Sequence, residues 1–256
     1  MIRSARLLAV GWVMHVKMLS RSSFNGILGL VYPLFFATVA FFLFREGSPH
    51  ALLYASLGAS VMGIWSATST AAGSALQRER WQGTLELLVA APAHFSLVLL
   101  PVTIAMSTIG LYSMGTTLLW GRVLFGIDVS IVHPALFIAA VVATITSIGM
   151  LGFLLAVSFV RYRTAWALGN LLEYPVWLIC GFLVPLSLFP GWVRPISWAL
   201  APTWGMRAIR EAALGGSPLP DLGVCLALGA GYTLVGVLVV ETLLASARAR
   251  ATVSLT

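Results

Sequence analysis

The chain has 256 residues, of which 59% are hydrophobic and only 9% are charged, and its mean hydropathy is +0.97. Soluble domains carry about a quarter of charged residues, so the composition excludes a water-soluble fold and favours a protein that lives in lipid. The net charge of +7 does not indicate a nucleic-acid partner, because the basic residues stand in short clusters between apolar runs.

Residues 2–22 are predicted to form an amphipathic helix at the membrane surface. At about 100° per residue, its basic side chains gather on the face opposite its apolar ones, a pattern typical of a helix in the cytoplasmic headgroup layer. A simple basic leader is the alternative. Basic residues interrupt this stretch, so a cleaved signal peptide is not expected and the chain should be retained whole. The expected interfacial anchors are Arg6, Trp12, Lys17 and Arg21.

Six apolar stretches are long enough to cross a bilayer, which takes about 20 helical residues. The second is rich in Gly, Ala, Ser and Thr, which let helices pack closely in lipid, so it is predicted to lie inside the bundle. With both termini in the cytoplasm, ten of the fifteen basic residues lie on the cytoplasmic side, as the positive-inside rule favours. The predicted spans are 24–44, 52–76, 96–120, 134–160, 164–187 and 222–245.

The connection after the second span, residues 77–92, has a charged start, a helix-forming middle and a proline at its end. Glu79 and Glu86 stand seven residues apart and therefore share one helix face, while Gly83 between them lets another surface come close. The pattern predicts a short cytoplasmic helix, and a solvated amphipathic linker is the alternative. The residues singled out here are Glu79, Trp81, Gly83, Thr84, Leu85 and Glu86.

Glu173 is the one carboxylate near the middle of a predicted span. A charge at the bilayer centre costs about 2.5–3.5 kcal/mol on insertion scales, so this side chain must face the bundle interior or a water-filled cavity. Asn170 precedes it by one turn, and Pro175 frees a carbonyl nearby. Two interpretations stay open: a cavity-lining group that selects cationic or polar substrate, or a protonated carboxyl that is hydrogen-bonded to a neighbouring helix.

Residues 188–216 hold too many prolines for a spanning helix and are too apolar for a free loop. Tryptophan prefers the membrane interface, so one or two short helices are predicted to dip into the outer leaflet and cap the bundle. Arg207 and Glu211 stand four residues apart, a spacing that allows an ion pair. The candidate residues of an outer gate are Trp192, Trp198, Trp204 and Arg207.

The sequence indicates no catalytic or metal site. Cys180 and Cys225 lie in apolar runs without a CxxC motif and are expected to be small core residues. The four histidines lack metal-ligand spacing. A phosphate loop of the G-x-x-x-x-G-K-[ST] type is absent, so this chain cannot bind ATP in that way.

The run Glu79…Gly83-Thr84-Leu85-Glu86…Pro92, placed after the second of six spans, resembles the motif of type-2 ABC transporter permeases, particularly the daunorubicin-resistance-like exporters of drugs and lipids. The resemblance covers essentially the whole chain. It implies that 77–92 is a coupling helix seated in a groove of a separate ABC ATPase subunit, which is present in two copies and binds ATP and Mg. It also implies a second permease subunit, giving a homodimer or a related heterodimer.

We therefore expect an all-α membrane protein, formed by one transmembrane permease domain over 1–256 in the bacterial plasma membrane. It should have six spans, the interfacial helix 2–22, the coupling helix 77–92 and an outer re-entrant segment 188–216. The expected function is ATP-driven outward movement of a lipophilic substrate. The alternatives are an exporter of lipid-linked glycan, a membrane-embedded accessory protein or enzyme, and an ATP-independent transporter or channel, against which no matched pair of broken helices is found.

Overall fold

The computed structural model describes residues 2–21, 31, 34–35, 37–39, 41–42, 49–81, 83, 94–159 and 165–250. All regular structure in these residues is helical, so the predicted all-α class is confirmed over this part of the chain. The elements are α1 (Ile2–Ser20), α3 (Pro49–Trp81), α5 (Ser96–Phe125), α6 (Pro134–Phe159), α7 (Ala165–Ile179), the 3-10 turn η1 (Leu186–Leu188), α8 (Val193–Trp198), α9 (Ala201–Leu214) and α10 (Leu219–Arg250).

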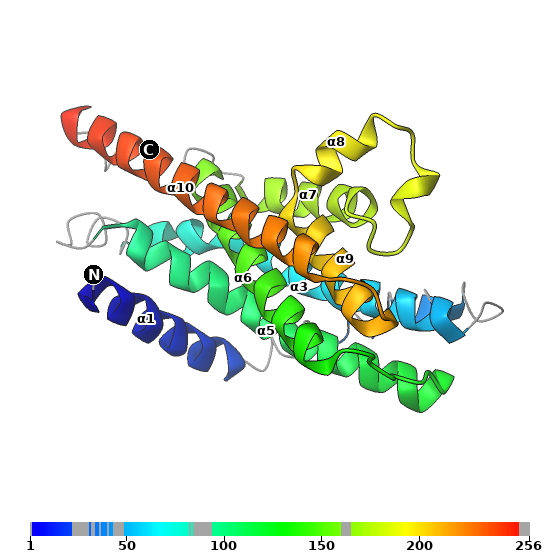
Figure 1. The fold of residues 1–256 in the computed structure, drawn as a ribbon. Helices are drawn as coiled ribbons and strands as arrows, with labels where there is room; N and C mark the ends of the chain where they lie inside the picture. Colours follow the sequence, from blue (N-terminus) through cyan, green and yellow to red (C-terminus); the bar gives the residue numbers. More distant parts are fainter. Residues whose placement is uncertain are drawn as a thin grey trace.

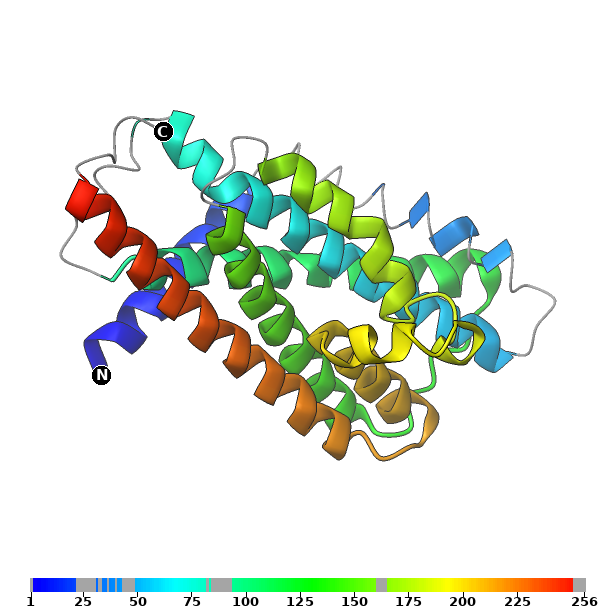
Figure 2. The ribbon, with the colours of Figure 1, turned by 90° about the horizontal axis from the view of Figure 1, so that it is seen from above.

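The long helices α3, α6 and α10 run in roughly one direction, α5 crosses them at an angle, and α1 lies against α5 (Figures 1 and 2). The start of α1, the end of α3 and the end of α10 lie together at one end of the bundle, which we call the terminal end (Figure 2). The opposite end, which we call the far end, holds the start of α3, the end of α9 and the start of α10. The first residues of the motif, at the end of α3, therefore lie at the end of the bundle where α1 begins and α10 ends.

Three described helices are long and apolar enough to cross a membrane, over Ser96–Phe125, Pro134–Ser158 and Leu219–Thr242. Each coincides with a predicted span, which supports the assignment of the chain as a membrane protein. The predicted first span, 24–44, lies mostly outside the described residues, so the six-span layout stays a prediction.

Helix α3 covers the second predicted span and lies inside the bundle, where residues 55–65 are all buried. Its neighbour α5 approaches so closely that a Cβ on Gly110 would lie 2.6 Å from the Cα of Ile64. Gly149 of α6 meets α5 in the same way, with Ile104 Cα 2.8 Å from its Cβ position. Glycines of α5 and α6 let the helix backbones approach closely at these two crossings.

Helix α7 ends at Ile179, eight residues before the end of the predicted span 164–187. Gly181 has a φ of 71°, and the N–H groups of Gly181 and Phe182 donate to the carbonyls of Leu178 and Trp177. This is the Schellman arrangement that closes a helix on a left-handed residue. At 1.5 Å per residue the 15-residue helix is about 22 Å long, which is shorter than the roughly 30 Å hydrocarbon core of a bilayer.

Candidate functional site

The predicted coupling motif begins as the last turns of α3, because this helix runs without interruption to Trp81. The sequence predicted a helix that starts at residue 77, but in the structure residues 77–81 belong to α3. Glu79 and Trp81 lie on this extension. The chain turns at the exposed Gly83, whose φ of 68° favours glycine. Thr84, Leu85 and Glu86 lie outside the described residues, so the coupling role stays a prediction.

His94 stands directly before α5, and there the chain contacts the last helix, α10. His94 Nδ1 lies 3.0 Å from Glu241 Oε1, and the two side chains are 74% and 48% exposed. An exposed pair of this kind contributes little to stability. The pair does show that His94, two residues after the motif, lies beside α10 at the terminal end. The two residues are 147 positions apart, and the sequence did not indicate their contact.

Helix α1 lies against α5 and forms over most of the predicted range 2–22. Trp12 Nε1 donates to Thr108 Oγ1 at 3.0 Å, so this side chain is directed at α5. The basic anchors predicted on the opposite face, Arg6, Lys17 and Arg21, are all exposed. The helix is present with its charges outward, and its position in the headgroup layer stays a prediction.

Glu173 is buried between α7 and α3, with 7% of its surface exposed. It accepts a hydrogen bond of 2.5 Å from Ser66 Oγ of α3. Asn170, one turn earlier on α7, is half-buried. Glu173 therefore faces the bundle interior, as the cost of exposing it to lipid requires, and Ser66 is the partner that sequence analysis did not find.

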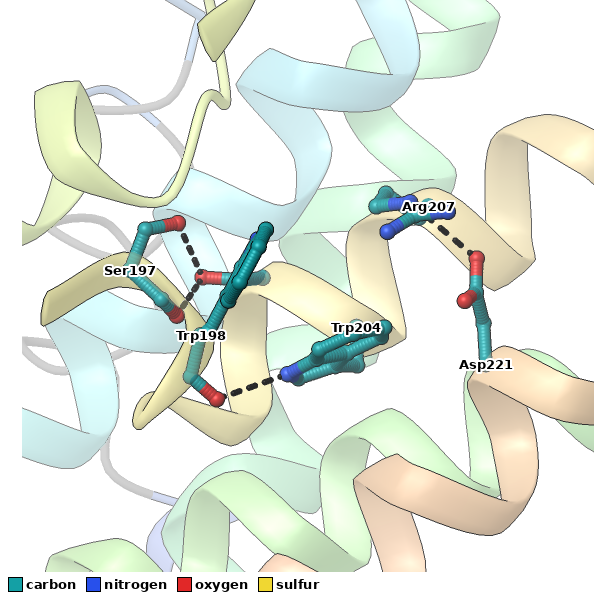
Figure 3. A network of polar contacts seen from close by, with 6 residues as sticks. Ser197, Trp198, Trp204, Arg207 and Asp221 are labelled. Atoms are coloured by element: carbon teal, nitrogen blue, oxygen red, sulfur yellow. Dashed lines mark hydrogen bonds and ion pairs between the residues drawn. The ribbon is translucent and has the colours of Figure 1, made fainter. Parts of the chain in front are cut away.

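The segment 188–216 contains the short helix α8 and the longer helix α9, joined by a sharp turn at Ala199 and Leu200 (Figure 3). Thr203 Oγ1 of α9 donates to the carbonyl of Ser197 at 2.7 Å, and Trp204 Nε1 donates to the carbonyl of Trp198 at 2.8 Å. Side chains of α9 thus satisfy carbonyls at the end of α8 that have no intrahelical partner. Part of the turn is therefore held by side chains of α9 itself.

Arg207 points from α9 to the start of α10 (Figure 3). Its Nε lies 3.2 Å from Asp221 Oδ2, and its guanidinium lies 5.0 Å from the ring centroid of Trp204. The ion pair with Glu211 that the i, i+4 spacing allowed is thus replaced by one with the buried Asp221. Burial raises the pKa of Glu211, nearby Asp221 raises it further, and Arg207 acts in the opposite direction.

Tyr232 of α10 holds the turn between α8 and α9. Its hydroxyl donates to the carbonyl of Ala199 at 2.5 Å and accepts from the N–H of Ala201 at 3.0 Å. Tyr232 lies 13 residues after Leu219, which is about 20 Å along a helix of 1.5 Å rise per residue. The first turn of α9 therefore lies level with the middle of α10, and α9 runs from there to the far end.

Arg210 of α9 lies in the interior, where only 8% of it is exposed. It links α9 to α3 and to the residues that follow α7. Its guanidinium donates to the carbonyls of Gly181 at 2.7 Å and Phe182 at 2.5 Å, directly after α7. It also lies 3.3 Å from the ring centroid of Tyr54 on α3. Nothing in the sequence singled out Arg210 as a contact between helices.

A Cβ on Gly58 of α3 would lie 1.7 Å from the Phe182 carbonyl oxygen and 2.9 Å from Arg210 Nη2. Only glycine fits at this contact, because the clashing oxygen belongs to the backbone and cannot rotate away. Gly58 therefore allows α3, the end of α7 and Arg210 to meet.

Residues 6–214 match the family model of the ABC-2 type transporter, and this match covers most of the chain. The chain belongs to the ABC-2 type transporter family. It is accordingly a membrane permease subunit, and permeases of this family generally work with an ATPase subunit. No curated protein shows a significant match to the chain.

The predicted gate residues of this ABC-2 permease fall into two groups. Trp198 and Trp204 meet at the turn between α8 and α9, and Arg207 lies further along α9, over the ring of Trp204 (Figure 3). Trp192, at the start of α8, is 69% exposed. Their prediction rested on the preference of tryptophan for interfaces, which locates a segment near the membrane surface and does not identify its partners.

Proposed function

We propose that this ABC-2 permease is the transmembrane subunit of an exporter that moves a lipophilic substrate outward, driven by ATP hydrolysis in a separate nucleotide-binding subunit. The terminal end is then the cytoplasmic end, with both termini in the cytoplasm of a bacterial plasma membrane. The observation that carries the proposal is the end of α3, where the motif begins. Helix α3 has a buried stretch at 55–65 and ends at Trp81, at the end of the bundle where a cytoplasmic ATPase is proposed to bind.

The coupling works as a lever in this proposal. A rigid helix that continues into the bundle core transmits a displacement better than a loop does, because packed interiors do not deform continuously. Glu79, Trp81, Gly83, Thr84, Leu85 and Glu86 are the proposed contacts with the ATPase. The ATPase is proposed to be present in two copies and to bind ATP and Mg, and a second permease subunit, identical or related, completes the complex.

The substrate is proposed to be a drug, a lipid or a similar lipophilic molecule. Glu173, with Asn170 beside it, is the charged group proposed to contact it, because an intramembrane carboxylate is by default a candidate functional group. A lipid-linked glycan is the alternative substrate class within the same mechanism.

Reconstitution tests the function directly. The permease, purified from its native membrane with its bound partners, should bring down an ATPase of the size of a single nucleotide-binding domain. Proteoliposomes of that complex should move a fluorescent lipophilic compound in the direction set by Mg-ATP. Transport of the same compound by the permease without the ATPase would contradict the proposal and favour an ATP-independent transporter.

A further inference from the structure

Helix α9 is attached unequally to its neighbours. It packs mainly against α6 and α10. Gly205 meets α6 so closely that a Cβ there would lie 2.4 Å from Thr144 Oγ1, and Arg207 pairs with Asp221 of α10. Toward the end of α7 the charged contact comes from a single side chain, that of Arg210.

The partners of Arg210 are unusual for a buried guanidinium. Such a group is normally paired with a carboxylate, because its desolvation costs several kcal/mol. In the part of the chain that the structure describes, Arg210 has instead main-chain carbonyls and the ring of Tyr54, and its Nε has no hydrogen-bond partner. The carbonyls follow the C-terminus of α7, where the helix dipole favours a cation.

We propose that Arg210 is the latch of the outer closure: it holds α9 on the ends of α7 and α3, and its release opens the seam between α9 and α7. Helix α9 stays on α6 and α10 during this opening. The proposal rests on the outward transport proposed above, because it assigns the exit of the substrate to this seam.

Release of this latch is energetically accessible because its partners are neutral. A buried carboxylate would add the Coulomb attraction between two full charges to these hydrogen bonds, so it would hold Arg210 more firmly than neutral carbonyls do. Water that enters an opening seam can replace both carbonyls at the guanidinium. A static brace would gain from a carboxylate at this place, and a contact that must open in every cycle would not.

The chain carries a reporter on each side of the seam. Cys180 directly precedes Gly181 at the end of α7, and only 2% of it is exposed. Cys225 of α10 is fully buried on the α6 side, where Ser147 donates to its carbonyl at 3.0 Å. Opening between α9 and α7 exposes Cys180 and leaves Cys225 covered, whereas loss of the whole α8–α9 element exposes both.

The test measures alkylation by a membrane-impermeant maleimide, with the whole permease in nanodiscs. Cys225→Ala protein reports Cys180, and Cys180→Ala protein reports Cys225. We expect Arg210→Met to raise the labelling rate of Cys180 about tenfold, which corresponds to about 1.4 kcal/mol in the closed–open equilibrium. The labelling of Cys225 should not change.

Arg207→Met is the matched control, because it removes an equal charge from α9 but acts at the contact with α10. It should leave Cys180 protected. Arg210→Lys keeps the charge and lacks the fork that reaches both carbonyls, so it should give intermediate labelling even if Arg210→Met folds poorly. An unchanged Cys180 rate in both Arg210 variants, an equal rise in Arg207→Met, or a parallel rise at Cys225 would overturn the latch.

A second arm adds the ATPase subunit and Mg-ATP to permease in which Arg210 is unchanged. Labelling of Cys180 should rise during turnover and fall again when the nucleotide is exhausted. The first arm needs no ATPase, so a negative result there removes the latch and leaves the proposed function intact. Labelling that responds to Arg210→Met and ignores ATP would mean that Arg210 is a static brace and would overturn its role as a latch.

Discussion

Two ionisable side chains of opposite sign are buried where α3 and α7 meet. Glu173 accepts from Ser66, and Arg210 donates to the carbonyls after α7. Twelve residues of α3 separate Ser66 from Tyr54, which is about 18 Å at 1.5 Å per residue, so the two side chains occupy different depths along the same helix pair. Glu173 lies near the middle of α3, and Arg210 lies nearer the far end.

Sequence alone located one of these two groups. Glu173 stands out because a mid-span carboxylate is costly in lipid. Its partner Ser66 could not be identified, because it is 107 positions away on a helix with many similar small residues. Arg210 could not be recognised either, because its partners are main-chain carbonyls, which any sequence supplies.

Substitution of Glu173 tests its proposed contact with substrate. Glu173→Gln keeps an acceptor for Ser66 and removes the charge, so the fold should persist. We expect kcat/KM for a cationic lipophilic substrate to fall about tenfold, equal to about 1.4 kcal/mol, and that for a neutral analogue to stay unchanged. If Glu173→Gln left kcat/KM unchanged for both compounds, Glu173 would be only a structural hydrogen-bond partner.

The close approach at Gly58 predicts a loss of stability. Gly58→Ala puts a methyl group against the Phe182 carbonyl, so the helix ends must separate, and overpacking of this kind costs about 1–3 kcal/mol or more. We expect a lower melting temperature in detergent, followed by size-exclusion chromatography. Gly115→Ala on α5 is the control, because nothing lies within 4 Å of its Cβ position. A melting temperature of Gly58→Ala equal to that of Gly115→Ala would show that α3 and the end of α7 are not in contact here.

At the scale of helices, continuous apolar runs made α5, α6 and α10 predictable to within a few residues. The predicted fifth span exceeded α7, because residues 180–187 are apolar enough to continue a helix. Its actual end depends on the left-handed Gly181 and on Arg210 from another helix, and both are tertiary features. The prolines of residues 188–216 correctly indicated short helices. The attachment of their turn to Tyr232 could not be predicted, because the contacting residues stand more than 30 positions apart.

Tyr232→Phe tests the attachment of the α8–α9 turn to α10. The substitution leaves the Ala199 carbonyl and the Ala201 N–H without their partner, which costs about 1–3 kcal/mol when such groups are buried. We expect faster hydrogen exchange over 199–204 and an unchanged rate in α5. The exposed Tyr112 of α5 offers the control, and Tyr112→Phe should leave this exchange unaltered. Unchanged exchange in Tyr232→Phe would show that the turn is held elsewhere.

At the scale of the whole molecule, α10 connects the two ends of the bundle. Glu241 near its end meets His94 at the exit of the motif, Tyr232 holds the α8–α9 turn, and Asp221 pairs with Arg207. A displacement at the end of α3 is therefore carried toward the far end by α3 itself, and the exposed contact between His94 and Glu241 adds only a weak link to α10. This arrangement suits a permease that is moved from the cytoplasm.

Charge inversion at the motif tests this transmission. Glu86→Lys should abolish ATP-dependent export and leave the amount of protein in the membrane unchanged, because it places a cation at the proposed ATPase contact. Asp128→Lys makes the same inversion in the exposed far-end loop and should leave export intact. Normal export by Glu86→Lys would remove the motif from the mechanism.

Photo-crosslinking in the native membrane tests the central claim, that a separate ATPase binds this permease through residues 77–92. A photoreactive amino acid at Glu86 should capture a polypeptide that hydrolyses ATP and has the size of one nucleotide-binding domain. The same group at the exposed Trp192, at the proposed outer side, should capture no such protein. Capture of the ATPase from Trp192, or of no ATPase from Glu86, would contradict the account.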